Sequence, residues 1–375
     1  MRPWTLFLAL TLPLLACSGE DDDTTGAGTT GDGTTGDDAT VGESTSDDAT
    51  TSMTTSGASS STSSSGGTTG DVTTTSTSTT TSASTATTSD TTTTGDPTEG
   101  TTGAPACDGD GLKPGDHTVT LMHGGKMRSA LVHVPQSYDP FSPTPLVLNF
   151  HGLTSNAGQQ VFFSGMNLTS DAEGFVVAYP EGINSSWNAG ACCGDAMNQN
   201  IDDVGFVRAL VEELEGLLCV DERRIYATGM SNGGFMSHRL ACEAADVFAA
   251  AAPVSATMVL GQCAPSRPIP MMMFNGTADS LVLYNGGLYP SAPQTFADWG
   301  DRDLCVGEPV VSKQVGATTC ERYESCADDV QVAFCTHEGM GHCWPGNAFC
   351  PIGQANTDLD ANAEMWAFFA KFALP

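Results

Sequence analysis

Hydrophobic positions recur along residues 107–375 with two spacings, and together they predict alternating strands and helices. Two alternating segments, 118–122 and 129–134, predict an antiparallel pair that turns at Gly124 and Gly125. Short apolar runs then fit strands buried on both faces, at 146–150, 175–179, 248–254, 270–274 and 330–334. Helical patterns occupy 156–172, 204–218 and 361–372.

Strands that alternate with helices of this length predict an α/β fold with a mostly parallel central sheet and helices on both faces. The 269 residues from 107 to 375 are enough for one large domain with a substantial core. In such sheets, functional side chains gather at the carboxyl ends of the strands. The segment 183–203, which is rich in Asn and Gly, predicts an irregular loop at this rim.

The first 106 residues show neither the strand-like nor the helical pattern of hydrophobic residues. Residues 1–17 begin with Met1 and Arg2, continue through an apolar run at 6–15 and end at Cys17, which predicts a secretory signal too short to span a bilayer. The ending Leu-Leu-Ala-Cys resembles a bacterial lipobox, in which the cysteine carries lipid. The alternative is an ordinary secretory signal cleaved nearby, and either interpretation takes the chain out of the cytoplasm.

Residues 18–106 contain no Lys, Arg or aromatic residue, and small or acidic residues fill nearly every position. Such a segment buries too little apolar surface to offset its chain entropy. We therefore predict a disordered tether rich in Thr, Ser, Gly and Asp, with a glycosylated stalk as the alternative.

Charge and cysteine content limit the partners, substrates and metal sites that the chain could have. The chain carries a formal charge of −31, and residues 107–375 hold 30 Asp and Glu against 12 Lys and Arg. So acidic a surface disfavours nucleic acid and anionic membrane as partners and suits a neutral or apolar substrate. Twelve of the 13 cysteines lie in this part, which predicts disulfides whose pairing the spacing leaves open. A zinc site is the alternative, but no C-x-x-C pair is followed by another.

The segment 225–237, I-Y-A-T-G-M-S-N-G-G-F-M-S, holds the main candidate for chemistry. A strand leads into Gly229-x-Ser231-x-Gly233, and a helix follows, which is the context of the nucleophile turn in the α/β-hydrolase fold. A serine in a strained turn is held clear of the sheet, so its neighbours two positions away must be almost without side chain. We predict this fold with Ser231 as the nucleophile; the alternative is that Ser231 only caps the helix.

A serine nucleophile requires a histidine, which follows it along the chain in this fold. His238 lies in the same helix, two turns further on, and cannot reach back. His337 ends a strand, whereas His342 lies in the loop G-M-G-H-C-W-P-G, whose glycines let the backbone turn the ring inward. We therefore choose His342 as the base; the alternative is a histidine at the rim with no role in catalysis.

The acid of the triad should follow a strand between the serine and the histidine. Asp279 comes five residues after Phe274, in N-G-T-A-D, and is the acid so placed. The other aspartates lie beside a predicted surface helix or before the last strand: 298, 301, 303, 328 and 329. Asp202 and Asp203 precede the serine and are interpreted as charges at a helix N-terminus, with a role in a substrate loop as the alternative.

The oxyanion of a tetrahedral intermediate needs two preorganised donors. We expect the N–H of Asn232, next after the nucleophile, to be one. The other should come from the loop after strand 146–150, where we choose Leu153 over its neighbour Thr154. His151 is then either a positioning residue or a plain structural one.

Six segments occur in the order expected for a known group: N-F-H-G-L, W-N-A-G-A-C-C-G, D-D-V-G-F-V, G-M-S-N-G-G-F-M, N-G-T-A-D and G-H-C-W-P-G. They resemble the secreted polyhydroxybutyrate depolymerase, feruloyl esterase and acetylxylan esterase group of carbohydrate esterase family 1, from about residue 115 to the end. The resemblance implies an α/β-hydrolase fold with the triad Ser231, Asp279 and His342. One departure is Asn275, which stands where the group usually has the histidine of H-G-T.

The resemblance also implies that Trp344 lines the substrate site, although Trp344 could merely pack against Pro345. His151 and Trp187 are further candidates for that lining. The predicted protein is an exported serine esterase, anchored through lipid at Cys17, monomeric and without metal or cofactor. Its expected substrate is a polyester of hydroxyalkanoates, a feruloylated or acetylated polysaccharide, or a small ester. A serine peptidase and a surface binding protein without activity are the rival classes.

Overall fold

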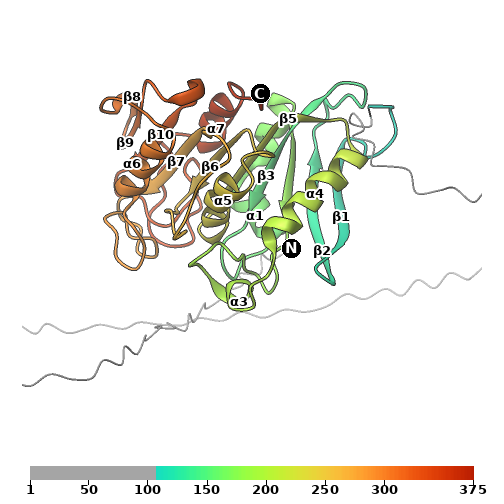
Figure 1. Cartoon of the computed structure of the whole chain (residues 1–375), viewed down its shortest axis with the longest axis horizontal. Helices are drawn as coiled ribbons and strands as arrows, with labels where there is room; N and C mark the ends of the chain where they lie inside the picture. Colours follow the sequence, from blue (N-terminus) through green and yellow to red (C-terminus); the bar gives the residue numbers. More distant parts are fainter. Residues whose placement is uncertain (1–106) are drawn as a thin grey trace, which may run out of the picture. The chain divides into compact units, whose positions relative to one another are not determined.

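The computed structural model describes residues 107–375, which form an α/β fold around one ten-stranded sheet (Figure 1). The signal, the lipidation site and the tether predicted for residues 1–106 lie outside the described residues. In sheet order the strands are β1 (Gly115–His123), β2 (Lys126–Val134), β4 (Val176–Pro180), β3 (Thr144–Phe150), β5 (Val220–Met230), β6 (Ala250–Val254), β7 (Met271–Gly276), β10 (Val332–His337), β9 (Thr318–Arg322) and β8 (Val310–Val315).

The middle of the sheet is parallel and its two margins are antiparallel. Strands β4, β3, β5, β6, β7 and β10 pair in parallel, while β1 and β2 on one side and β9 and β8 on the other run antiparallel to their neighbours. The predicted α/β-hydrolase fold with a mostly parallel centre is confirmed. The carboxyl ends of the six parallel strands therefore meet at one edge of the sheet, where a site is expected.

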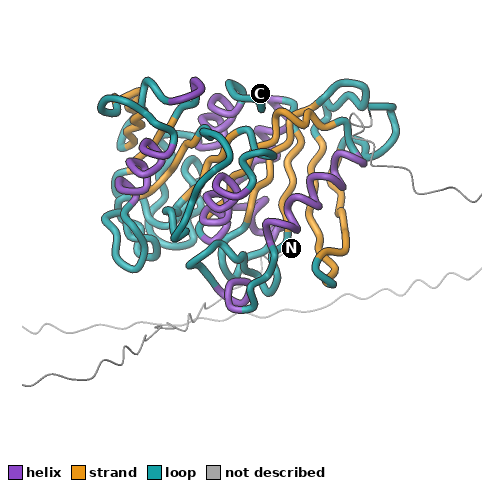
Figure 2. The backbone as a smooth tube through the Cα atoms, in the orientation of Figure 1, coloured by secondary structure: helices purple, strands orange, loops and turns teal. Residues whose placement is uncertain are grey.

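Helices cover both faces of the sheet (Figure 2). They are α1 (Ala157–Ser164), α2 (Met166–Glu173), α3 (Gly194–Asn198), α4 (Asp203–Leu217), α5 (Asn232–Glu243), α6 (Ala292–Arg302) and α7 (Ala361–Phe369), with a short 3-10 turn at Ala327–Asp329. Apolar residues of α4, α5 and α6 pack into one cluster, and those of α1, α2 and α7 into another.

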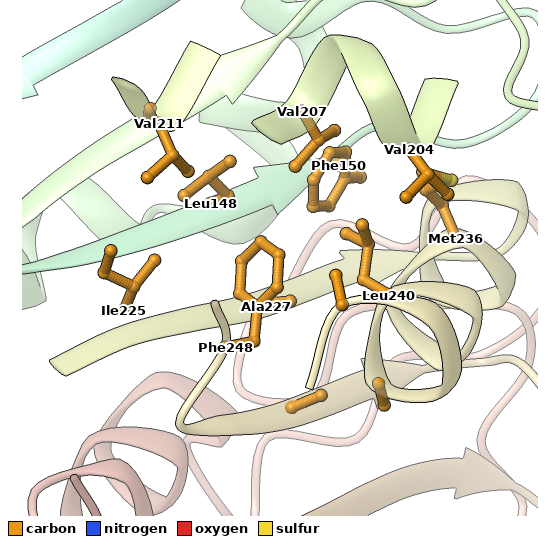
Figure 3. Packing of buried hydrophobic residues seen from close by; sticks show 14 of the residues in the cluster. Leu148, Phe150, Val204, Val207, Val211, Ile225, Ala227, Met236, Leu240 and Phe248 are labelled. Atoms are coloured by element: carbon orange, nitrogen blue, oxygen red, sulfur yellow. The ribbon is translucent and has the colours of Figure 1, made fainter. Parts of the chain in front are cut away.

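Successive residues of one strand contribute to the two cores in turn, because side chains alternate across a strand. In β3, Leu148 and Phe150 belong to the first core, whereas Val147 belongs to the second. Figure 3 shows the first core, in which Leu148 and Phe150 pack beside Val207 of α4 and Leu240 of α5. All of these side chains are almost fully buried. This packing holds α5, and with it the residue that precedes α5, against the end of β3.

The structure corrects three local predictions. The single helix expected over 156–172 is two helices, because Gly165 takes a left-handed conformation (φ 60°) between α1 and α2. The hairpin of β8 and β9 was not predicted; β8 is exposed along its whole length, so its sequence lacks the apolar alternation of a covered strand. The segment 183–203, expected to be an irregular loop, contains the short helix α3. Its two cysteines bond to each other.

All twelve cysteines of the described region form disulfides, so the prediction of a disulfide-braced domain is confirmed. The pairs are Cys107–Cys219, Cys192–Cys193, Cys242–Cys263, Cys305–Cys326, Cys320–Cys335 and Cys343–Cys350. Within residues 107–375, no three His, Cys, Asp or Glu side chains are placed to share a metal ion. No helix in that same region is both long and apolar enough to cross a membrane.

Candidate active site

Ser231 is the single residue between the last residue of β5 and the first residue of α5. Its backbone is in the left-handed half of conformational space, with φ 57° and ψ −121°. Its N–H donates to Val254 O of the neighbouring strand β6 (2.9 Å). A Cβ on Gly229 would lie 2.6 Å from Phe150 O, and one on Gly233 would lie 2.1 Å from the same oxygen. The Gly-x-Ser-x-Gly spacing therefore exists because the turn presses against the end of β3.

His342 and Asp279 form a buried pair at the ends of β10 and β7. The distance from His342 Nδ1 to Asp279 Oδ2 is 2.7 Å, and the two side chains are 5% and 1% exposed. The other carboxylate oxygen, Oδ1, accepts from the N–H groups of Leu281 (2.8 Å) and Val282 (2.9 Å). A carboxylate only accepts, so in the neutral ring of His342 the proton lies on Nδ1 and Nε2 is the acceptor. This is the state that a general base requires.

Backbone contacts hold the loops that carry the pair. Ala278 N donates to Met340 O (3.0 Å), which joins the loop after β7 to the loop after β10. A Cβ on Gly276 would lie 2.2 Å from the same Met340 oxygen, so only glycine permits this approach. His342 N donates to Ile352 O (2.8 Å), and the Cys343–Cys350 disulfide closes the loop between them. The glycine-rich sequence around His342 thus serves close backbone packing.

The loop of His342 is also held close to the turn that carries Ser231. Ser255, the residue after the Val254 that binds Ser231 N, donates its hydroxyl to Cys343 O (3.2 Å). Among the hydrogen bonds of residues 107–375, none joins Ser231 Oγ to His342 Nε2. Catalytic hydrogen bonds of this kind often tighten only when substrate binds.

The two predicted oxyanion donors keep their N–H groups available. Neither Leu153 N nor Asn232 N donates to another residue within 107–375, whereas Thr154 N is engaged by Ser185 O (2.8 Å). Gly152 lies against Ser231, since a Cβ there would be 3.4 Å from Ser231 Cβ. Of the two neighbours considered in the sequence, Leu153 is therefore the one with a free donor beside the serine.

Three residues that the sequence analysis offered as lining of the substrate site are buried, as its alternatives for His151 and Trp344 allowed. His151 and Trp187 are 0% exposed and Trp344 is 1% exposed, so a substrate cannot touch them in this conformation. Trp344 Nε1 donates to Asn362 Oδ1 of α7 (3.0 Å), and Trp187 Nε1 donates to the backbone oxygen of His151 (3.0 Å). These side chains brace the loops of the site from inside.

The remaining histidines after Ser231 are buried away from the pair. His337 Nδ1 is bonded to Thr318 Oγ1 (2.8 Å), and burial lowers its pKa to about 4. His238 Nδ1 accepts from Trp299 Nε1 (3.0 Å), and burial lowers its pKa to about 3. Neither has the carboxylate partner that His342 has.

The side chain of Asn232 has a role that the sequence did not reveal. Its Oδ1 accepts from Trp187 N (2.7 Å) and its Nδ2 donates to Trp187 O (3.0 Å). The asparagine thereby brackets the backbone of the segment 183–203 and attaches it to the start of α5. No local pattern could show this contact, because 45 residues separate the two partners.

The two aspartates before α4 have different environments. Asp202 is the N-cap, accepting from Gly205 N (2.9 Å), as a helix N-terminal charge should. Asp203 is 0% exposed and pairs with the buried Arg128 (2.8 Å), whose guanidinium stacks 3.7 Å from the centre of the Phe206 ring. Burial raises the pKa of Asp203, and the charge of Arg128 partly offsets that rise. Burial likewise lowers the pKa of Arg128, and the charge of Asp203 partly offsets that fall. Asp203 is thus a structural ion, out of reach of substrate.

Asp303, Asn275 and a surface hollow lie outside the proposed triad. Asp303, expected beside a surface helix, is buried and accepts from Ile269 N (3.0 Å). Asn275 is buried and donates to Ala256 O (3.1 Å). A hollow of about 760 Å³ borders Ala278 and Phe349 and has no charged lining residue, but Ser231 does not line it.

Ser231 lies in a strained turn between a parallel strand and a helix, and a buried His–Asp pair lies on the loops that follow two further strands. This arrangement is that of the α/β-hydrolase class. Comparison with known proteins identifies the family within that class. Residues 131–286 match the family described as Esterase PHB depolymerase. The chain is 34% identical to Feruloyl esterase B of Piromyces equi over 268 residues, which cover 66% of this chain and 46% of that protein.

Two other proteins extend the comparison. Putative esterase NocK of Nocardia uniformis subsp. tsuyamanensis is 33% identical over 229 residues, which cover 55% of this chain and 67% of that protein. Among solved structures, the acetyl xylan esterase from Aspergillus awamori has a TM-score of 0.46 at 16% identity, covering 68% of this chain and 99% of that one. The chain belongs to the Esterase PHB depolymerase family. The family resemblance predicted from the six sequence segments is confirmed, although the chain spans only about half the length of the Piromyces protein.

Proposed function

We propose that residues 107–375 form a carboxylic ester hydrolase that works through a serine nucleophile. The observation that carries the proposal is the buried Asp279–His342 pair (2.7 Å) on loops tied to the strained turn of Ser231. The family supports ester hydrolysis as the reaction class. The geometry supports the assignment of the triad within that class.

In the proposed reaction Ser231 Oγ attacks the ester carbonyl while His342 Nε2 takes its proton. Asp279 holds the imidazole in the correct tautomer and stabilises the imidazolium. The N–H groups of Leu153 and Asn232 bind the oxyanion. His342 then gives its proton to the departing alcohol, and water, activated by the same imidazole, releases the acid from Ser231.

We propose an ester-bearing polymer as the substrate. The support is the family description and the names of the feruloyl esterase relatives. Export is part of the same proposal: six disulfides suit an oxidising compartment, and the predicted signal at residues 1–17 would direct the chain there. Lipidation at Cys17 and a monomeric state remain predictions.

The test uses p-nitrophenyl acyl esters, methyl ferulate, acetylated xylan, hydroxybutyrate polymer and a peptide, each with wild type and Ser231→Ala. Wild type should hydrolyse at least one ester, should prefer it to the peptide, and should react with a fluorophosphonate. Ser231→Ala should lose both reactions. Equal ester hydrolysis by the two proteins would refute the mechanism, and preference for the peptide would move the protein to the peptidase class.

A further inference from the structure

His151 is a fully buried histidine that the proposed reaction does not use. Both of its ring nitrogens are engaged: Gly182 N–H donates to Nε2 (3.0 Å), and Nδ1 lies 2.8 Å from Gly152 O. Since Nε2 accepts, the proton of the neutral ring must sit on Nδ1, which donates to Gly152 O. Burial lowers the pKa of His151 to about 4, so the ring keeps this neutral form near neutral pH.

The oxygen that Nδ1 holds belongs to the peptide group that carries the predicted oxyanion donor. Gly152 C=O and Leu153 N–H are the two polar ends of one planar trans peptide, and they point in opposite directions. Fixing the oxygen against the ring therefore sets the direction of the Leu153 N–H. Ser155 N also donates to Gly152 O (3.2 Å), but it belongs to the same loop and can move with it.

His151 is itself connected to the other oxyanion donor. The backbone oxygen of His151 accepts from Trp187 Nε1 (3.0 Å), and Trp187 N donates to Asn232 Oδ1 (2.7 Å). The imidazole and indole rings pack with their centroids 5.1 Å apart. A continuous set of buried contacts thus joins the peptide of Leu153 to Asn232. A shift of the imidazole would change the spacing of the two donors.

We propose that His151 is a positioning residue for the oxyanion hole, whose Nδ1–H holds the Gly152–Leu153 peptide so that Leu153 N–H faces the developing oxyanion. This inference rests on the proposed function, because it names how one of the two donors of that same site is oriented. The charged groups around the ring are Glu181, with Oε1 3.7 Å from Nε2, and Arg128. Neither replaces the bond to Gly152 O.

Two substitutions separate the two ring nitrogens. In His151→Asn the side-chain NH2 can occupy the place of Nδ1 and donate to Gly152 O. In His151→Gln the longer side chain can accept from Gly182 N at the place of Nε2 but leaves Gly152 O without its donor. Both variants remove the ring, so both should lose similar thermal stability, which makes them a matched pair.

We expect His151→Gln to lower kcat about 10²- to 10³-fold, the range for loss of one oxyanion donor. His151→Asn should lower it less than about tenfold, and KM should change little in both, because the donor acts on the transition state. Equal kcat values in the two variants, or losses that follow melting temperature, would overturn the inference. Loss of activity in Ser231→Ala with no difference between the pair would leave the proposed function standing and refute only the role of His151.

A measurement on the unchanged protein covers the case in which a variant does not fold. Nitrogen-15 NMR of the histidine rings should show His151 protonated at Nδ1, and the Leu153 amide proton should move downfield when a fluorophosphonate forms its tetrahedral adduct on Ser231. Protonation of His151 at Nε2, or an unmoved Leu153 amide, would overturn the inference. Failure of the reagent to label Ser231 would instead count against the proposed function.

Discussion

The substitution Asp279→Asn replaces one oxygen of the carboxylate by an NH2 group, and the structure decides where that group must lie. Oδ1 accepts from the N–H groups of Leu281 and Val282, while Oδ2 faces His342 Nδ1. Two N–H groups cannot face an NH2 group, so the amide oxygen must take the place of Oδ1. The NH2 group is then directed at His342 and can only donate.

The consequence is the wrong tautomer of the catalytic imidazole. His342 Nδ1 must become an acceptor, so the ring proton moves to Nε2, which can no longer take the proton of Ser231. Locking the base of a triad in this way lowers kcat about 10⁴-fold, which corresponds to about 5 kcal/mol in the activation barrier. The free energy of unfolding should fall by only about 1.5–3 kcal/mol, because one hydrogen bond to a charged group is weakened.

The assay is turnover of a p-nitrophenyl ester at neutral pH, together with urea unfolding to show that Asp279→Asn is folded. Asp298→Asn is the matched control, since Asp298 lies partly exposed in α6 and only accepts from Gln294 Nε2 (2.8 Å). It should keep the activity of the wild type. Retention of kcat within tenfold in folded Asp279→Asn would refute the assigned triad.

Three further predictions concern stability. Gly233→Ala would place its Cβ 2.1 Å from the carbonyl oxygen at the end of β3, so it should lower the free energy of unfolding by about 3 kcal/mol or more. Gly216→Ala is the control, because open space surrounds Gly216 in α4. In the same denaturant titration it should raise the free energy of unfolding by up to about 1 kcal/mol. Arg128→Met should destabilise by about 3–5 kcal/mol, because Asp203 would be left buried without its partner; adding Asp203→Asn should recover part of the loss, and no recovery would contradict this account. His238 has a folded pKa near 3, below its unfolded value of 6.5, so its stabilising contribution is complete above pH 6.5 and is lost as the pH falls toward 3. The stability difference between wild type and His238→Asn should therefore shrink by about 3 kcal/mol between pH 6.5 and pH 4, and a constant difference would show that the histidine is not buried in its neutral form.

The strands of the parallel centre could be predicted because burial on both faces leaves continuous apolar runs in the sequence. Strands β3, β6, β7 and β10 each overlap the run that predicted them. The exposed strand β8 reads V-V-S-K-Q-V and lies at the margin of the sheet, where neither face demands apolar residues. The spacing of hydrophobic residues indicates which faces are buried, so it cannot predict a strand whose two faces are both exposed.

The burial of His151, Trp187 and Trp344 could not be predicted from the sequence for a different physical reason. Each carries a polar group that finds its partner far along the chain: His151 Nε2 meets Gly182 N, and Trp344 Nε1 meets Asn362 Oδ1. A polar aromatic residue near a catalytic loop can face substrate or can be buried with its hydrogen bond satisfied. Only the fold determines which of these occurs, because the partner belongs to another element.

The triad and the substrate preference differ in how far sequence can reveal them, and backbone packing explains the difference. A Cβ on Gly233, Gly276 or Gly341 would meet a backbone oxygen of a neighbouring segment at 2.1–2.3 Å. The segments that carry the proposed triad are therefore positioned by main-chain contacts that only glycine allows, and glycines at such spacings can be recognised in the sequence. The side chains free to meet a substrate, such as Leu153 (40% exposed) and Phe349 (48% exposed), lie on the outer surface of these loops. Phe349 packs against Phe162 and Phe163 of α1. Neither Leu153 nor Phe349 supplies a backbone contact of the glycines named above, so a substitution of either side chain can change the substrate without moving the proposed triad.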